Sequence, residues 1–143
     1  MNLKIIYEDG NLLVVDKPAG IDIEGIKIAL PRGFAPAHRL DKDTSGVLLI
    51  AKNQETLDFL QKQFQERKVG KKYICLAEGN IKEDQGVIET LVGRAKGDRR
   101  KQRVYLAGEP GSEDKREAVS SYRVLQRFKA RLGEVRIGSQ SLG

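Results

Sequence analysis

Short runs of β-forming residues, separated by turn residues, recur along most of this 143-residue chain. The first two runs flank Asp9-Gly10, a dipeptide that strongly favours a tight hairpin turn between strands. Only one stretch has helical spacing, with Leu57, Leu60 and Phe64 on one face. Strands are predicted at Leu3 to Tyr7, Asn11 to Asp16, Gly46 to Ala51, Tyr73 to Glu78, Gly86 to Leu91, Gln102 to Ala107, Ala118 to Phe128 and Leu132 to Ile137.

The connections between these runs indicate the fold class. Most are short, and short connections join neighbouring strands in an antiparallel sheet. Asn53 can cap the single predicted helix and Gly70 suits its end. Residues 21–45 are rich in glycine, proline and aspartate, so they are predicted to be irregular. The sequence therefore predicts one α+β domain over residues 1–143, with a mixed, largely antiparallel sheet and few helices.

The scarce residue types exclude several kinds of site. Cys75 is the only cysteine and His38 the only histidine, which rules out a disulfide framework and a zinc site built from several such ligands. The common phosphate-loop, dinucleotide-binding and HExxH motifs do not occur. No apolar run approaches the roughly 18 residues of a membrane helix, and the first residues do not resemble a signal peptide. A cytoplasmic protein without membrane association is expected, using carboxylate chemistry or binding alone.

Positive charge is concentrated in two segments. Residues 94–103 hold six basic residues and one acid, and residues 61–72 hold five basic residues and one acid. A single run of this kind is usually solvated surface. Two runs in a chain of net charge +6 favour a polyanionic partner, because Lys and Arg displace counterions from phosphates. The candidate nucleic-acid contacts in the first segment are Arg94, Arg99, Arg100, Lys101 and Arg103.

The most informative segment is HRLDKDTSG, residues 38–46, which precedes a predicted buried strand. A loop presents polar side chains, and the strand behind it holds them in place. Asp41 is a candidate nucleophile or base, Arg39 a candidate phosphate contact, and His38 a candidate donor. An ordinary polar turn with a surface ion pair between Arg39 and Asp41 explains the same residues. The residues by themselves leave both interpretations open.

Four segments form one ordered pattern: IIYEDGNLLVVDKPAG (5–20), HRLDKDTSGVLLIAK (38–52), KKYICLAEG (71–79), and GVIETLVGRAKGDRRKQRV (86–104) followed by EAVSSYRVLQRF (117–128). The second segment is similar to a signature, HRLD-x-x-[ST]-[ST]-G before an apolar strand, and the third to a K-x-Y-x-A-x-x-x-G strand. Together they resemble the RluA-type RNA pseudouridine synthase family. The first segment resembles the family's opening hairpin with its KP-x-G turn. The resemblance extends to about Ile137.

This resemblance implies the pseudouridine synthase catalytic fold and an isomerase that converts uridine to pseudouridine in structured RNA, ribosomal or transfer, without metal or cofactor. It implies that Asp41 is the catalytic aspartate, which attacks C1′ or removes a C2′ proton. The nucleotide must be flipped out of its helix, and Arg39 is implied to stabilise that state. Tyr73 is implied to pack on the base. From its strand position alone, alternating with Cys75 and Ala77, Tyr73 would be a core residue.

After a strand like LGEVRI the family continues with a TGR-x-HQIR segment, whereas residues 138–143 read GSQSLG. No S4 RNA-binding domain is expected before the catalytic region. We therefore expect a partial catalytic domain, incomplete at its C-terminus, whose last strand, Leu132 to Ile137, is an exposed edge that allows self-association. Two functions follow. The first is an isomerase that uses Asp41, with turnover requiring a continuation of that type, and the alternative is a catalytically silent RNA-binding remnant.

Overall fold

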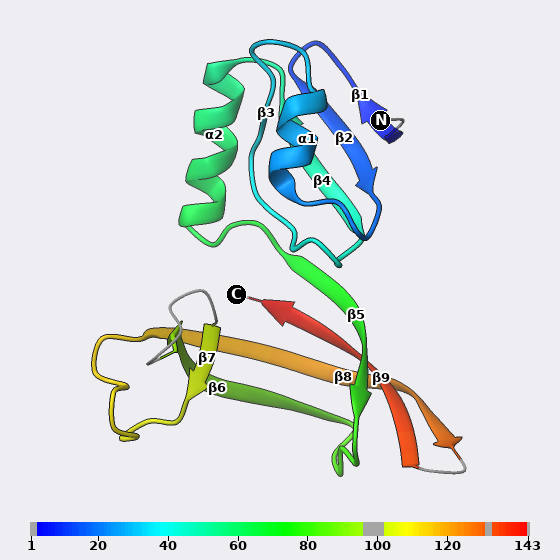
Figure 1. Cartoon of the computed structure of the whole chain (residues 1–143), viewed down its shortest axis with the longest axis vertical. Coiled ribbons are helices and arrows are strands. Elements are labelled where there is room, and N and C mark those ends of the chain that lie inside the picture. Colours follow the sequence, from blue (N-terminus) through cyan, green and yellow to red (C-terminus); the bar gives the residue numbers. More distant parts are fainter. Residues whose placement is uncertain (1–2, 96–101, 131–132, 143) are drawn as a thin grey trace. The chain divides into compact units, whose positions relative to one another are not determined.

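The computed structural model describes residues 3–95, 102–130 and 133–142, with side chains as far as residue 128. These residues form two compact units, Met1–Val69 and Gly70–Gly143, each with its own sheet (Figure 1). Every strand pair within them is antiparallel. The predicted α+β class with largely antiparallel pairing is therefore confirmed, although the strands form two sheets instead of one. Neither helix in the described residues is long and apolar enough to cross a membrane.

The first unit combines a four-stranded sheet, in the order β1-β2-β4-β3, with two helices (Figure 1). Its elements are β1 (Lys4–Glu8), β2 (Leu12–Lys17), α1 (Ile23–Ala29), β3 (Ala35–Pro36), β4 (Gly46–Ala51) and α2 (Gln54–Gln65).

The predicted hairpin between β1 and β2 is present, and Asp9 builds its turn. The Asp9 carboxylate accepts hydrogen bonds from the main-chain N–H groups of Asn11 at 2.8 Å and Leu12 at 2.7 Å. It also accepts one from the Tyr7 hydroxyl at 2.8 Å. These bonds, the one from Asn11 first, favour the ionised form and lower the pKa of Asp9. The side chain therefore supplies the turn with acceptors that the main chain lacks.

The two helices differ in how clearly the sequence predicts them. Helix α2 begins as predicted at Asn53, whose side chain accepts a hydrogen bond from the N–H of Thr56 at 2.8 Å. Helix α1 lies in the region predicted to be irregular, so that prediction is wrong there. Asp22 caps it by accepting from the N–H of Gly25 at 2.8 Å. Seven residues with an internal glycine make a weak local signal, and the helix is stabilised because Ile26 is fully buried in the core.

Alternate residues of β2 and β4 supply the core of the first unit. Leu13 lies opposite Ile50, and Val15 lies opposite Leu48, and these four side chains pack together with Ile26 of α1. The next residue of β2 with the same alternation is Lys17, which faces the core rather than solvent because successive strand side chains point to opposite faces. Lys17 lies opposite Gly46, where β4 begins. This end of the sheet carries the loop that contains Asp41.

The second unit is a five-stranded sheet in the order β5-β9-β8-β6-β7. Its elements are β5 (Lys71–Glu78), β6 (Gln85–Arg94), β7 (Gln102–Tyr105), β8 (Arg116–Ala130) and β9 (Gly133–Leu142).

The position of β9 corrects one expectation. The strand predicted at Leu132 to Ile137 is described from Gly133 on as β9, and it is not an exposed edge, since β9 pairs with β5 on one side and β8 on the other. It also continues through residues predicted to be featureless, as far as Leu142. A strand paired on both sides is held by its main-chain hydrogen bonds, so a polar segment such as residues 138–142 can belong to it. The open edges of this sheet are β5 and β7. Self-association stays a prediction.

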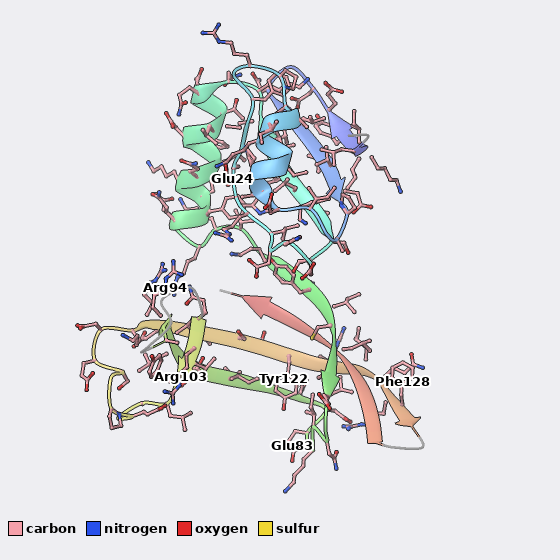
Figure 2. All side chains as sticks on the ribbon, in the orientation of Figure 1. Glu24, Glu83, Arg94, Arg103, Tyr122 and Phe128 are labelled. Atoms are coloured by element: carbon pink, nitrogen blue, oxygen red, sulfur yellow. The ribbon has the colours of Figure 1, made fainter. Side chains whose placement is uncertain are left out.

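A close approach at Gly86 gives a test of the second sheet. Gly86 on β6 lies opposite Tyr122 on β8, and a Cβ atom added at Gly86 would come within 2.8 Å of the Tyr122 ring (Tyr122 is labelled in Figure 2). Because overpacking forces side chains off their preferred rotamers, Gly86→Ala is expected to lower the free energy of unfolding by about 1–3 kcal/mol. The measurement is urea unfolding of both proteins.

The matched control for this change is Gly70→Ala. Gly70 belongs to the same unit, and a Cβ atom there would meet nothing within 4 Å. Its free energy of unfolding should stay within about 0.5 kcal/mol of the unmodified chain, as for ordinary surface substitutions. Equal unfolding midpoints for the two glycine variants would contradict the packing of Tyr122 over Gly86.

Candidate active site

The loop that contains Asp41 leaves the sheet directly after β3. Ala37 continues the strand pairing by donating its N–H to the carbonyl of Leu49 at 2.9 Å. The N–H of Leu49 then donates to Nε2 of His38 at 3.1 Å, so the imidazole takes the place of a main-chain carbonyl where the strand departs. The His38 ring also packs against Phe64 of α2, with ring centroids 4.8 Å apart. His38 therefore anchors the start of the loop.

Alternation along the loop exposes the two candidate side chains. Leu40 is buried with 7% of its surface exposed, while the side chains of Arg39 and Asp41 on either side are 75% and 84% exposed. Nη2 of Arg39 lies 3.5 Å from Oδ1 of Asp41. An exposed pair of this kind contributes at most about 1 kcal/mol, so either group can exchange its partner for a substrate group. Arg39 and Asp41 are thus brought together as the sequence suggested.

Main-chain hydrogen bonds hold the loop around Asp41. The N–H of Thr44 donates to the Asp41 carbonyl at 3.0 Å, which closes a turn. The N–H of Gly20 donates to the Lys42 carbonyl at 2.8 Å, which ties the loop to the turn after β2. Gly20 has a φ of +88°, a conformation that favours glycine. An exposed carboxylate on a loop tied down in this way can act as a nucleophile or base with little reorganisation.

Sequence reasoning missed one member of this arrangement. This member is Lys17, whose Nζ donates a hydrogen bond to the carbonyl of Lys42 at 3.2 Å. A signal was present, because Lys17 continues the inward-facing alternation of Leu13 and Val15. What the lysine contacts in that position depends on a loop 25 residues further along the chain. In the part of the chain that the structure describes, no group of three or more His, Cys, Asp and Glu side chains forms a candidate metal site.

The other predicted site residues belong to the second unit. Tyr73 lies on β5, half-buried and alternating with the half-buried Cys75 and Ala77. Arg94 ends β6 and Arg103 lies on β7 (both are labelled in Figure 2). The remaining predicted RNA contacts, Arg99, Arg100 and Lys101, lie outside the described residues.

Tyr105 organises the hairpin between β6 and β7. It is fully buried, and its hydroxyl donates to the carbonyl of Arg94 at 2.9 Å. The guanidinium of Arg103 lies 4.9 Å from the centre of the Tyr105 ring, and Nζ of Lys115 lies 5.4 Å from it. Arg103 also forms an ion pair with Glu109. The hairpin base therefore contains a buried tyrosine whose ring contacts two cations.

The strand register divides the basic residues of this hairpin between two faces. Gly93 lies opposite Arg103, and Arg94 lies opposite Gln102. Because successive residues alternate, Arg94 and Arg103 point to opposite faces of the hairpin. One flat surface cannot contact both side chains in the same way.

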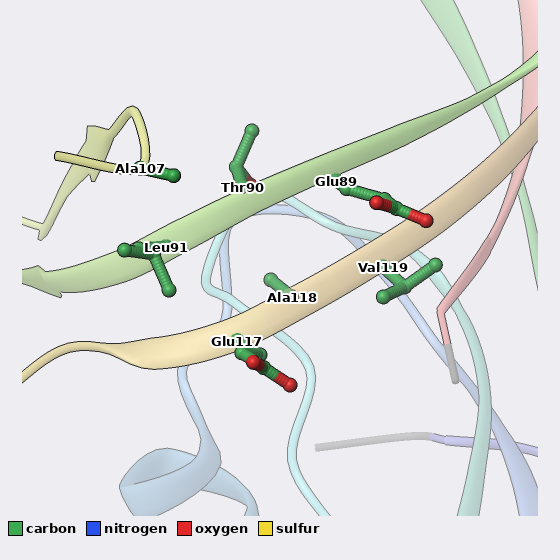
Figure 3. Close-up of a pocket in the computed structure, with 7 residues that line it drawn as sticks. All are labelled: Glu89, Thr90, Leu91, Ala107, Glu117, Ala118 and Val119. Atoms are coloured by element: carbon green, nitrogen blue, oxygen red, sulfur yellow. The ribbon is translucent and has the colours of Figure 1, made fainter.

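A hollow of about 300 Å³ lies on the second sheet, lined by Glu89, Thr90, Leu91, Ala107, Glu117, Ala118 and Val119 (Figure 3). None of the residues predicted from the sequence lines it. Two of its side chains are carboxylates, Glu89 on β6 and Glu117 on β8. Their negative charge opposes the binding of RNA phosphates. We therefore do not assign this hollow to the candidate site.

Known proteins resemble this chain in sequence. A profile of the family described as RNA pseudouridylate synthase matches residues 11–140. The chain is similar to ribosomal large subunit pseudouridine synthase D of Borreliella burgdorferi, with 37% identity over 149 residues, covering 88% of this chain and 44% of that protein. It is also similar to the uncharacterized RNA pseudouridine synthase YlyB of Bacillus subtilis, with 34% identity over 151 residues, covering 90% of this chain and 47% of that protein.

A solved structure shows the same likeness in three dimensions. It is human RNA pseudouridylate synthase domain containing 1, which matches with a TM-score of 0.83 and 28% identity, covering 99% of this chain and 59% of that one. The chain thus spans about half the length of the curated relatives that it matches.

Proposed function

The chain belongs to the RNA pseudouridylate synthase family, and from this premise we propose that it isomerises uridine to pseudouridine in RNA with Asp41 as the catalytic carboxylate. The observation that carries the proposal is the setting of Asp41. Its side chain is 84% exposed beside Arg39, on a loop whose main chain is hydrogen-bonded to the turn after β2 and to β4. A carboxylate in this setting is accessible to a ligand, because its ion pair with Arg39 is itself exposed.

The reaction suits a site with one carboxylate. The N1–C1′ bond of uridine breaks, the uracil turns, and a C5–C1′ bond forms, so the atoms of the nucleoside are conserved and no oxidant or reductant is consumed. Asp41 attacks C1′, or removes a proton from C2′, and is regenerated when the base is reattached. The C5 proton is lost after reattachment, and N1 gains one. The chain contributes a carboxylate, its orientation and the surrounding charge.

The substrate has to be presented outside the helical stack. A base inside a helix cannot be reached, so the nucleotide is flipped out. We propose that Arg39 stabilises this state, because its exposed guanidinium is suited to bidentate contact with phosphate. Tyr73 is proposed to pack on the base, on the strength of the K-x-Y-x-A pattern of β5. Its half-burial on that strand is compatible with a ring that has one face available.

The RNA itself is proposed to be ribosomal or transfer RNA, bound in part by the basic segment 94–103. Relatives named as ribosomal large subunit pseudouridine synthases support the ribosomal choice. Arg94, Arg99, Arg100, Lys101 and Arg103 supply the positive charge that phosphates require.

The experiment is an incubation of the chain with uridine-containing ribosomal and transfer RNA transcripts, followed by mapping of pseudouridine. The chain is assayed as it stands and also joined to the C-terminal remainder of a relative that contains a TGR-x-HQIR segment. Pseudouridine at a defined uridine is the expected result for the joined form, because turnover is expected to require a continuation of that type. RNA binding without pseudouridine in both forms would overturn the proposal in favour of a silent RNA-binding protein.

A further inference from the structure

Strand pairing assigns each residue of the second sheet to one of its two faces. Directly opposed residues belong to the same face, and successive residues along a strand belong to opposite faces. Tyr73 of β5 lies opposite Gln140 of β9, which lies opposite Tyr122 of β8 (Tyr122 is labelled in Figure 2). Tyr122 in turn lies opposite Gly86 of β6. These four positions define one face of the sheet, which we call the tyrosine face.

The same face carries two arginines near the hairpin of β6 and β7. Steps of two residues lead from Tyr122 to Arg116 along β8, and from Gly86 to Arg94 along β6. The register between β6 and β8 is continuous over these positions. Arg116 lies opposite Val92, and Arg94 lies two residues further along β6. The two arginines are therefore diagonal neighbours on adjacent strands, a spacing of about 7–8 Å.

The acidic residues of these strands belong to the other face. In β5, β6, β7 and β8 they are Glu78, Glu89 and Glu117. Each lies an odd number of residues from the tyrosine-face position on its own strand, and two of them line the hollow described above (Figure 3). Arg103, which points to that other face, is ion-paired with Glu109. Within these four strands, the tyrosine face thus carries arginines and no carboxylate.

Arg116 is available to a ligand. Its side chain is exposed, and in the part of the chain that the structure describes it forms no ion pair or side-chain hydrogen bond. Arg127 on the same strand shows the contrasting case, because its guanidinium donates a hydrogen bond to the carbonyl of Ile81 at 2.8 Å. The guanidinium of Arg116 can therefore form bidentate hydrogen bonds with a phosphate without breaking a contact of the fold.

We propose that Arg116 is an RNA-phosphate contact that acts with Arg94, so that the bound strand crosses the tyrosine face, an inference that rests on the proposed function. Arg116 lies outside both basic segments of the sequence. Tyr73, the residue proposed to pack on the base, lies on the same face, so phosphates of flanking nucleotides can reach the two arginines. The carboxylates of the other face repel phosphates.

The first test compares Arg116→Gln with Arg123→Gln in RNA affinity over a series of salt concentrations. Arg123 is the matched control, because it is an exposed arginine on the same strand that belongs to the other face, and both changes remove one positive charge. Arg116→Gln is expected to weaken RNA affinity about fivefold and to reduce the slope of log K against log[salt] by about 0.7. Arg123→Gln should leave the slope unchanged.

A conservative variant separates charge from folding. Arg116→Lys keeps the charge but loses the bidentate geometry, so it should keep the salt slope of the unmodified chain. Urea unfolding of all three variants should give the midpoint of the unmodified chain, since the side chains are exposed. Equal slopes for Arg116→Gln and Arg123→Gln, or a reduced slope for Arg116→Lys, would overturn the proposal.

The second test locates the RNA on one face by thiol alkylation. In a Cys75→Ala chain, Val104→Cys and Val119→Cys each introduce a single thiol at a valine of similar exposure, 54% and 45%. Val104 lies opposite Val92 on the tyrosine face, and Val119 belongs to the other face. Saturating ribosomal RNA transcript is expected to slow alkylation by iodoacetamide several-fold for Val104→Cys and to leave Val119→Cys unchanged. Equal protection of both thiols would overturn the proposal.

Both tests measure binding alone, so they are independent of turnover. If the chain binds the transcripts but neither of its two forms makes pseudouridine, the proposed isomerase fails, and the salt slopes and alkylation rates still decide whether Arg116 contacts the RNA. An unmodified chain that binds none of the transcripts would overturn both proposals.

Discussion

Replacement of Asp41 by asparagine is expected to reduce pseudouridine formation on the order of 10⁴-fold or more, the scale of losses when a sole nucleophile is removed. The amide is nearly isosteric with the carboxylate, but it cannot attack C1′ or accept a C2′ proton. The main-chain bonds of the loop do not involve the side chain, so the fold is retained. The measurement is single-turnover formation of pseudouridine, with RNA affinity determined alongside and expected within several-fold of the unmodified protein.

Asp43→Asn is the matched control for this experiment. Asp43 lies two residues away in the same exposed turn, and the change removes the same charge from the same loop. Its rate should stay within about threefold of the unmodified protein, because surface charges mainly alter association. Appreciable turnover by Asp41→Asn, or an equal loss in Asp43→Asn, would remove Asp41 from the catalytic role.

Neutralising Arg99, Arg100 and Lys101 together, each to glutamine, is expected to weaken RNA binding and flatten its salt dependence. On a single strand, each basic side chain that no longer binds a phosphate reduces the slope of log K against log[salt] by about 0.7. Three such side chains therefore account for up to about 2 in the slope. The measurement is RNA affinity over a series of salt concentrations, and the rate on fully bound RNA should change little.

A triple change elsewhere separates local contacts from net charge. Lys4, Lys27 and Lys82 are exposed in the structure, and replacing them with glutamine removes the same three positive charges from separate places. If segment 94–103 contacts the RNA, only the first triple variant should alter the salt slope. Equal slopes in both variants would show that the segment is solvated surface, with charge acting only over long range.

Much of the first unit could be predicted because its signals are local. Asp9 lies two residues from Asn11, whose N–H it accepts, and Asn53 lies three from Thr56, so a sequence window contains both partners. Helix α1 could not be found in this way. It has little intrinsic stability, and its strongest contact is the burial of Ile26 against β2 and β4, which is absent from any local window.

In the second unit, the order of the strands in the sheet could not be predicted from local signals either. The sequence indicates most of its strands, because alternation and turn residues are local, but it does not say which strands are neighbours. β9 lies between β5 and β8, so a strand predicted to be an open edge is paired on both sides. The opposite orientation of Arg94 and Arg103 likewise follows from the register of β6 with β7. A charge count along the segment contains no information about faces.

For the candidate site, the sequence by itself determined the motif: the residues Arg39 and Asp41, their spacing, and the apolar strand that follows them. These depend on neighbours in the chain, and the same residues carry the likeness to the family. Only the tertiary structure decided which groups are hydrogen-bonded to the loop that contains Asp41. The ammonium of Lys17 reaches a carbonyl 25 residues away, and the sheet brings these groups together because β2 ends opposite the start of β4. A buried cation is stable only where its acceptors converge, and that convergence is a property of the folded chain.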